Sequence, residues 1–136
     1  MKDNLRTLYT WNGFDKDVIK LTAKLQTFVD SKLIKNIYGI PRGGLVVAVA
    51  LSHLLNIPLV LEKRLISRKT LIVDDISDSG KTFEKIIKNK KYFGTLALYS
   101  TPWTRHIPTY YVRSKKQNNW IVFPWETIKT SKYDNK

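Results

Sequence analysis

The segment from Leu71 to Thr82 limits the possible folds of this chain more than any other stretch. Apolar, partly β-branched residues lead into Asp74 and Asp75, and a short polar run containing Gly80 follows. A helical pattern comes next, so the segment is typical of a buried strand, a tight loop and the start of a helix. Units of this kind build α/β folds with parallel sheets.

The loop in this segment combines an anion site with carboxylates. Backbone N–H groups at the open end of a helix attract phosphate, and the residues there are Ser79, Gly80, Lys81 and Thr82. The two hydroxyls can donate further hydrogen bonds, and the glycine permits a close backbone approach. Asp74 and Asp75, at the end of the strand, can accept from sugar hydroxyls or hold Mg²⁺. A sugar phosphate that binds with Mg²⁺ would satisfy both halves.

From residue 74 to residue 82 the sequence resembles the signature of the type I phosphoribosyltransferases: two acids, two spacers, Asp followed by Thr or Ser and Gly, and a further Thr. In that family the loop holds the 5′-phosphate and ribose of phosphoribosyl pyrophosphate (PRPP). The other interpretation is an ordinary strand-to-helix turn, which needs no cluster of acids beside a glycine. The resemblance implies a PRPP site formed by Asp74, Asp75, Asp78, Ser79, Gly80, Lys81 and Thr82.

A second loop, residues 41–44, also follows an expected strand and precedes an expected helix. Its N–H groups can form an anion-binding nest, and its guanidinium can bind phosphate with two parallel hydrogen bonds. The loop resembles the pyrophosphate loop of xanthine–guanine and hypoxanthine phosphoribosyltransferases, which implies that pyrophosphate is bound by Arg42, Gly43 and Gly44. Lys63 and Arg64 resemble a basic pair that helps to neutralise pyrophosphate in several relatives. A solvated basic turn is an equally good interpretation of that pair.

The block from Trp120 to Glu126 is expected to form the base site. It resembles a block of the small 6-oxopurine phosphoribosyltransferases in which a Trp stacks on the purine and the next backbone reads the base edge. The resemblance implies these roles for Trp120 and Ile121, and a stacked indole is worth about 1–3 kcal/mol. For Trp125 a place in the core is the preferred interpretation, because alternate strand residues face opposite sides.

Two features depart from the family pattern. Relatives usually place a Lys that contacts the purine 6-oxygen just before the Pro after the last core strand, and Thr101 stands there in this chain. Thr101 can still donate a hydrogen bond, and Arg105 or His106 are candidates for the missing positive charge. Relatives also insert a flexible hood where this chain has only residues 62–69. The hood is short or missing, which implies poorer exclusion of water.

Periodicity predicts the remaining elements. Helices are expected at 15–32, with Asp15 as the N-cap, at 45–55 and at 82–90. The helix at 45–55 is apolar nearly all round, so it should be buried, with His53 as a structural residue. Strands that alternate with helices predict an α/β fold with a mainly parallel sheet and helices on both faces. The expected strands are 36–40, 58–61, 70–75, 95–99, 110–112 and 120–123.

The length of 136 residues suits one phosphoribosyltransferase-like domain. Its core is expected at about 10–101, an aromatic β-rich base-binding part at about 102–126, and a loose tail at 127–136. Ligands of open parallel sheets bind outside the carboxyl ends of the strands, so the two glycine loops should lie close together.

The charge of the chain is strongly basic, with 24 Lys and Arg against 11 Asp and Glu. Such an excess attracts polyanions, either nucleic acid or a pyrophosphorylated sugar. The lysines are scattered and are not interleaved with stacking aromatics, so the charge does not decide between these partners. The absence of cysteine excludes disulfides and thiolate chemistry. Neither a signal peptide nor a membrane span is apparent, so a cytoplasmic protein without a membrane partner is expected.

The resemblance implies an enzyme of purine salvage. It would transfer the phosphoribosyl group of PRPP to hypoxanthine, guanine or xanthine and release pyrophosphate, with Mg²⁺ held by Asp74 and Asp75 and with Asp78 assisting deprotonation of the purine. Relatives commonly form dimers or tetramers, which implies a homodimer or homotetramer. The alternative is a regulator on the same fold that senses PRPP or binds RNA, with little or no catalysis. A nucleotide kinase is remote, because Asp75 stands where a Walker loop requires glycine.

Overall fold

The computed structural model of the chain describes residues 5–127 and residue 129. The helical elements are α1 (Trp11–Asp30), α2 (Gly43–Leu55), the 3-10 turn η1 (Lys63–Leu65) and α3 (Lys81–Ile87). The strands are β1 (Leu5–Leu8), β2 (Asn36–Gly39), β3 (Thr70–Val73), β4 (Ile76–Ser77), β5 (Gly94–Leu96), β6 (Tyr99–Ser100), β7 (Arg113–Ser114) and β8 (Asn119–Val122). The tail expected at 127–136 falls, apart from residues 127 and 129, outside the described residues. Within them, no helix is long and apolar enough to cross a membrane.

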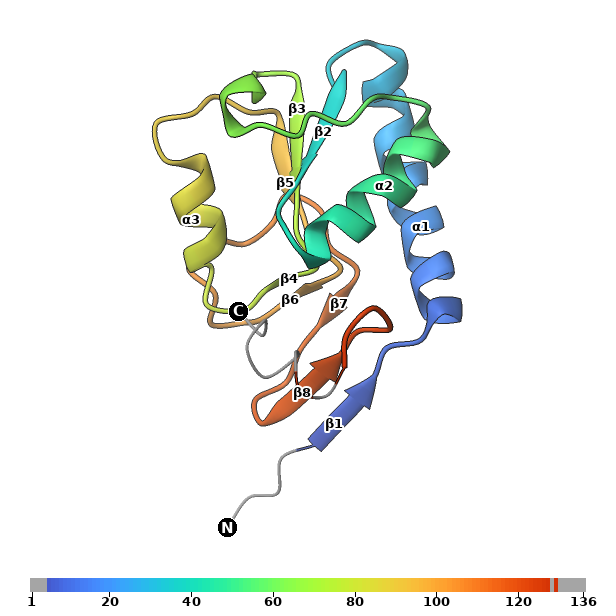
Figure 1. Cartoon of the computed structure of the whole chain (residues 1–136), viewed down its shortest axis with the longest axis vertical. Helices are drawn as coiled ribbons and strands as arrows, with labels where there is room; N and C mark the ends of the chain where they lie inside the picture. The colour runs from blue at the N-terminus through green and yellow to red at the C-terminus, as the bar shows by residue number, and fades with distance from the viewer. Residues whose placement is uncertain (1–4, 128, 130–136) are drawn as a thin grey trace.

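The strand pairings given for residues 5–127 are all parallel, which confirms the predicted α/β fold with parallel sheets. The main sheet has the order β2–β3–β5, and β4–β6–β7 continue it toward the carboxyl ends of the strands (Figure 1). The strand expected at 58–61 is only a bridge from Leu59 to Ile37. The strand expected at 110–112 is likewise a single bridge, from Tyr110, before β7 begins. Prolines near both bridges lack the N–H that a longer ladder needs.

Helices cover both faces of the main sheet (Figure 1). On one face, Leu71 and Val73 of β3 share a core with α1 and α2. The intervening residue, Ile72, faces the opposite side and packs with Phe83 and Ile86 of α3. Successive strand residues point to opposite faces, so a strand buried on both faces must be apolar throughout. This requirement explains the unbroken apolar run that precedes the acids.

The first helix begins earlier than its apolar periodicity indicates. Thr10 caps α1, because its side-chain oxygen accepts a hydrogen bond from the N–H of Gly13 at 3.0 Å. Asp15 lies inside the helix, so the prediction that it is the N-cap was wrong. A residue with a hydroxyl in the β conformation is an equally good cap, and the regular apolar spacing begins only at Val18, so it gave no reason to place the cap as early as Thr10.

The second helix is buried on one side only. Val47, Ala48 and Leu51 are fully covered, whereas Val49 and Leu54 are 43% and 47% exposed. His53 is also exposed, so the expectation of a helix buried all round, with a structural histidine, was wrong. The helix packs on β2 and α1 and forms part of the outer layer, so its far side meets solvent.

Aromatic residues from both ends of the described chain gather beside a separate pair of strands, β1 and β8. The ring of Phe123 lies 5.6 Å from that of Tyr9 and is stacked on Trp125 at 5.0 Å and 9°. Trp125 also contacts Phe14 of α1 edge-on at 5.5 Å. The assignment of Trp125 to the core is therefore confirmed, and this aromatic C-terminal part is joined to the start of α1.

An ion pair between a buried carboxylate and a half-exposed guanidinium strengthens that joint. Asp17 of α1 is 1% exposed and accepts hydrogen bonds from Arg113 Nε at 2.7 Å and from the Tyr9 hydroxyl at 2.5 Å. Burial and the hydrogen bond to Asp17 raise the pKa of Tyr9 well above its usual value. The Arg113 guanidinium also lies over the Tyr9 ring, 5.5 Å from its centroid. The start of β7 is thus anchored to α1.

Candidate functional site

Two loops meet at the carboxyl edge of the main sheet. β2 and β3 pair with Gly39 opposite Val73, so the loops that follow them start side by side. A Cβ added to Gly43 would overlap the Asp75 carboxylate, and one added to Gly44 would lie 2.5 Å from the Val73 carbonyl oxygen. Only glycine permits this approach. The prediction that the two glycine loops lie close together is confirmed.

The two acids that follow β3 lie beside the loop at 41–44, which follows β2 and is called the first loop below. Asp74 is 0% exposed and Asp75 is 2% exposed, and an Asp74 oxygen accepts the Asp75 N–H at 2.8 Å. Two adjacent carboxylates fit Mg²⁺, which commonly takes one or two protein carboxylates together with water and substrate oxygens. Among the described residues, no group of three or more His, Cys, Asp or Glu side chains could hold a metal. Mg²⁺ would therefore need substrate oxygens to complete its coordination.

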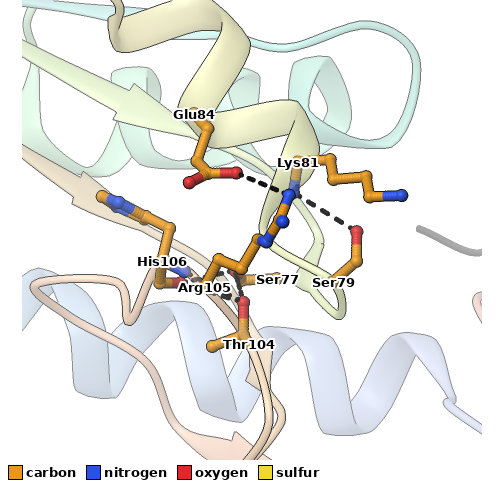
Figure 2. A network of polar contacts seen from close by, with 7 residues as sticks. All are labelled: Ser77, Ser79, Lys81, Glu84, Thr104, Arg105 and His106. Atoms are coloured by element: carbon orange, nitrogen blue, oxygen red, sulfur yellow. Dashed lines mark hydrogen bonds and ion pairs between the residues drawn. The ribbon is translucent and has the colours of Figure 1, made fainter.

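The loop that precedes α3 is called the phosphate loop below. Its glycine, Gly80, is in close contact with residues 104–106, which support the loop. Gly80 has a φ of +84°, and a Cβ added to it would lie 2.5 Å from the backbone nitrogen of His106. Ser77, at the base of the loop, donates its hydroxyl to the His106 carbonyl at 2.7 Å and lies 2.9 Å from the Thr104 hydroxyl (Figure 2). The glycine is thus required for contact with protein backbone, in addition to any approach of a ligand.

Arg105 and His106 face α3 and β5. Arg105 pairs with Glu84 of α3 at 3.5 Å (Figure 2). His106 Nε2 lies 2.7 Å from the Thr95 hydroxyl, and its ring packs on Phe83 at 4.9 Å. Burial lowers the pKa of His106. Arg105 therefore contacts α3 and His106 contacts β5 and Phe83, and a role for either as the positive charge near the base stays a prediction.

Asp78 is held through all three of its oxygen atoms. Its carbonyl oxygen accepts the Thr101 hydroxyl at 2.6 Å, and Oδ1 accepts Trp103 Nε1–H at 3.0 Å. Oδ2 accepts from the ammonium of Lys115 at 2.8 Å. The Thr101 hydroxyl hydrogen is therefore used on the backbone. Every one of these donors comes from the segment between β6 and β8, which ties the phosphate loop to the C-terminal part.

Lys115 was missed as a site residue by sequence reasoning. It is only 6% exposed, although it lies in the basic run 113–116 between the exposed residues Ser114 and Lys116. Nothing in the run distinguishes it from a solvated lysine. The signal that could have found it is topological, because the register of three short strands places it beside Asp78.

A cavity of about 450 Å³ lies between the first loop, η1 and the start of α3. Its lining contains lysines and no carboxylate, so its electrostatic field favours an anion. The lining residues are Tyr38, Ile40, Pro41, Lys63, Lys81, Thr82, Lys85 and Ile86. Lys63 thus shares a cavity with both glycine loops, whereas its neighbour Arg64 pairs with Glu62 at 2.6 Å on the surface.

The expected base residues lie on β8. Trp120 is half-buried, and Ile121 is 2% exposed within the aromatic core. β8 pairs with β1, with Trp120 opposite Arg6, and is separate from the main sheet. A partly exposed indole beside a firmly packed neighbour can present a ring face to a base. The stacking role of Trp120 stays a prediction.

Comparison with known proteins extends the likeness beyond these motifs. The xanthine-guanine phosphoribosyltransferase of Desulfotalea psychrophila is 29% identical over 152 aligned positions, which cover 93% of this chain and 91% of that protein. The protein of the same name from Cereibacter sphaeroides is 30% identical over 146 positions, with coverages of 86% and 84%. A purine phosphoribosyltransferase structure from Pyrococcus horikoshii has a TM-score of 0.77 at 34% identity and covers 90% of this chain and 95% of its own. No family model matches the sequence.

The sequence similarity, the similarity of fold and the arrangement of the two loops all indicate the same protein family. The matched relatives and the solved structure are covered over most of their own length, so the likeness includes the whole architecture as well as the glycine loops. The two loops with the sequence pattern of phosphoribosyl and pyrophosphate sites lie in contact at one sheet edge. The chain belongs to the type I phosphoribosyltransferases and is related to the xanthine–guanine and other purine phosphoribosyltransferases.

Proposed function

We propose that this protein transfers the 5-phosphoribosyl group of PRPP to a 6-oxopurine and releases pyrophosphate, as a step of purine salvage. The observation that carries the proposal is the contact between the loop at 42–44 and the loop at 74–82. PRPP has a phosphate at one end of its sugar and a pyrophosphate at the other, so two adjacent anion sites match it. The names of the related proteins support a purine as the acceptor.

The ribose phosphate binds to the loop before α3. Its phosphate accepts hydrogen bonds from the backbone N–H groups of residues 79–82 and from the hydroxyls of Ser79 and Thr82, a nest of donors that suits an anion. Asp74 and Asp75 accept from the ribose hydroxyls. Because both carboxylates are covered by Gly43 and Gly44 in this structure, sugar binding requires the first loop to move away from them.

The pyrophosphate binds to the first loop and the lysine-lined cavity beside it. Gly43 and Gly44 present backbone N–H groups, Arg42 supplies a planar guanidinium, and Lys63 approaches from η1. These positive groups stabilise the negative charge that grows on the departing pyrophosphate. Asp74 and Asp75 are the residues that would hold Mg²⁺, which would add to that stabilisation as a Lewis acid.

The base binds beside Asp78. Its ring stacks on Trp120, its edge is read by the backbone of Ile121, and Thr101 lies between the phosphate loop and the C-terminal part. In the reaction, the bond from ribose C1 to a pyrophosphate oxygen breaks and a bond from C1 to purine N9 forms. The purine loses a proton as it becomes the nucleotide, and the Asp78 carboxylate accepts it. Lys115 and Trp103 hold that carboxylate in place.

Assembly would compensate for the short hood. The connection from Leu59 to β3 contains only η1 as regular structure, so it offers little cover over the reacting atoms. We propose that residues 1–136 form one domain and that it assembles as a homodimer or homotetramer, in which a neighbouring subunit covers the site. Exclusion of water prevents a water molecule from attacking ribose C1 in place of the purine while positive charge develops there.

The test is a screen of pyrophosphate release. Purified protein is mixed with PRPP, Mg²⁺ and one base at a time: hypoxanthine, guanine, xanthine, adenine and uracil. The proposal expects turnover with at least one 6-oxopurine and none without a base. Absence of pyrophosphate release with every base would remove the enzymatic function. RNA binding with a steep salt dependence and no turnover would instead favour the regulatory alternative.

A further inference from the structure

A cavity of about 450 Å³ lies at the edge of the main sheet beyond β5, between α1 and the chain segment that leads into β7. The residues that line it are Lys20, Leu21, Ala23, Lys24, Tyr111 and Val112. None of these six belongs to the first loop, the phosphate loop or β8, to which the proposed reaction is assigned. The volume falls within the usual range of small-molecule sites, about 300–1,000 Å³. The proposed function therefore does not account for this cavity.

One wall of the cavity carries two lysines of α1. Lys20 and Lys24 are exposed and lie four residues apart, so their side chains are neighbours on one helix face. Within residues 5–127, no ion pair includes either of them. Like charges at this spacing repel each other, and nothing in the fold offsets that repulsion. A bound anion would offset it, and ammonium groups form strong, charge-assisted hydrogen bonds to phosphate.

The other wall carries a tyrosine whose ring the fold does not use. Tyr111 is 41% exposed, and in the described part of the chain it makes no ring contact and no hydrogen bond. The N–H groups of its neighbours, Tyr110 and Val112, donate into the sheet at 3.1 and 3.2 Å. Because strand residues alternate, the N–H of Tyr111 points to the open edge of the sheet. An aromatic face and a backbone donor are therefore available to a ligand.

We propose that this cavity is a second nucleotide site, which binds a nucleoside monophosphate away from the PRPP loops. The phosphate lies between Lys20 and Lys24, and the base stacks on Tyr111, whose ring suits any planar base. Leu21 and Val112 supply an apolar floor. Inorganic phosphate would leave the ring unused, and an uncharged aromatic molecule would leave the ammonium groups unused. A nucleoside monophosphate carries both features in one small molecule, and its binding here requires neither PRPP nor turnover.

The experiment must separate this site from the catalytic one, because Tyr111 also lines a smaller cavity beside Thr101 and the phosphate loop can itself bind a nucleotide. Thr82→Glu places a carboxylate in the phosphate loop, where it repels the phosphate of any nucleotide. An acid in the first turn of α3 suits the helix dipole, so the variant should fold. Calorimetry with adenosine monophosphate should still show one molecule bound per chain of Thr82→Glu, with a dissociation constant below about 1 mM.

Further substitutions in the Thr82→Glu protein identify the contacts. Lys20→Gln combined with Lys24→Gln removes both ammonium groups and should weaken adenosine monophosphate at least about tenfold. Tyr111→Ala should weaken it about 5- to 150-fold, the usual effect of losing one stacked base, whereas Tyr111→Phe keeps the ring and should keep the affinity. Lys16→Gln combined with Lys35→Gln removes the same charge from exposed positions outside the cavity lining, and its effect should be much smaller.

The outcomes do not depend on whether the wild type releases pyrophosphate. Affinity that is lost in the Lys20 and Lys24 double variant and in Tyr111→Ala, but kept in Tyr111→Phe, supports the second site. Absence of binding to Thr82→Glu, equal effects of the two lysine double variants, or unchanged affinity in Tyr111→Ala overturns it. Circular dichroism verifies each fold. If Thr82→Glu does not fold, the same substitutions in the wild type should lower the number of nucleotides bound per chain by one, and an unchanged number overturns the proposal.

Discussion

Two ion pairs anchor β7, one at its first residue and one at the residue that follows it, and they differ in what surrounds them. Arg113 pairs with Asp17 inside the aromatic joint between α1 and the C-terminal part, beside the Tyr9 hydroxyl. Lys115 pairs with Asp78 at the phosphate loop, at the edge where ligands of parallel sheets bind. The first pair joins elements of the core, and the second joins elements of the site. Two similar ion pairs on either side of Ser114 thus lie in different surroundings, and we expect the first to serve stability and the second to serve function.

The largest effect should follow from Asp78→Asn. The change keeps the side-chain shape and removes the proton acceptor, so pyrophosphate release with a 6-oxopurine should fall about 10²- to 10⁴-fold. The PRPP dissociation constant should change far less. Steady-state rates and PRPP calorimetry measure both. A variant with full activity at equal PRPP affinity would remove Asp78 from the chemistry.

The core pair should respond in stability. Asp17→Ala leaves Arg113 and the Tyr9 hydroxyl without their acceptor, and a buried polar group left unsatisfied costs about 1–3 kcal/mol. The lower end applies, because the Arg113 side chain is 44% exposed and can reach solvent. Urea unfolding measures the loss. If Asp17→Ala instead keeps its stability and loses activity, the contrast between the two pairs is wrong.

Gly43→Ala tests the contact between the glycine loops. The new methyl group would overlap the Asp75 carboxylate, and an overpacked methyl group costs about 1–3 kcal/mol. Because Gly43 moves away from Asp75 when PRPP binds in this account, the clash burdens the free protein, and its free energy of unfolding should fall by that amount in urea unfolding. Gly13→Ala is the matched control, because its Cβ would make an ordinary contact of 3.4 Å with the Thr10 hydroxyl. Equal free energies of unfolding in the two variants would contradict the tight approach of the loops.

Tyr9 sets an alkaline limit for the core. Its folded-state pKa is raised, first by burial and then by the hydrogen bond to Asp17, so the folded protein keeps a proton that the unfolded chain loses above about pH 10. The free energy of unfolding should fall above that pH, by at most about 1.4 kcal/mol per pH unit from this group. Tyr9→Phe should flatten the decline in urea titrations between pH 9 and 11. An unchanged slope would show that other tyrosines cause it.

His106 should produce the smallest effect, on the acid side. Burial lowers its folded-state pKa. As the pH falls through about 6.5, His106 is therefore protonated in the unfolded chain but stays neutral in the folded protein. Stability should therefore be complete above about pH 6.5 and fall as the pH decreases below it. His106→Gln keeps a polar group near Thr95 and should weaken this acid dependence. Thermal unfolding at pH 5 and pH 7 compares the two proteins, and identical pH dependence would exclude His106 as the cause.

The phosphate loops could be predicted from the sequence because their chemistry is local. The residues from Asp74 to Thr82 are consecutive, and the glycines at 43 and 44 adjoin the arginine. The Lys115–Asp78 pair could not, because it depends on the register of three two-residue strands. The N-cap at Thr10 and the half-exposed second helix were missed for a related reason. Local periodicity does not reveal which cap is used or which layer lies outside.

The most direct test of the account is a crystal structure of the protein with PRPP and Mg²⁺. The account predicts one PRPP molecule that spans both loops, with its 5′-phosphate on residues 79–82 and its pyrophosphate beside Arg42 and Lys63. It also predicts that Gly43 has moved away from the Asp75 carboxylate. A PRPP molecule that contacts only one of the loops, or that binds elsewhere on the basic surface, would contradict the central claim.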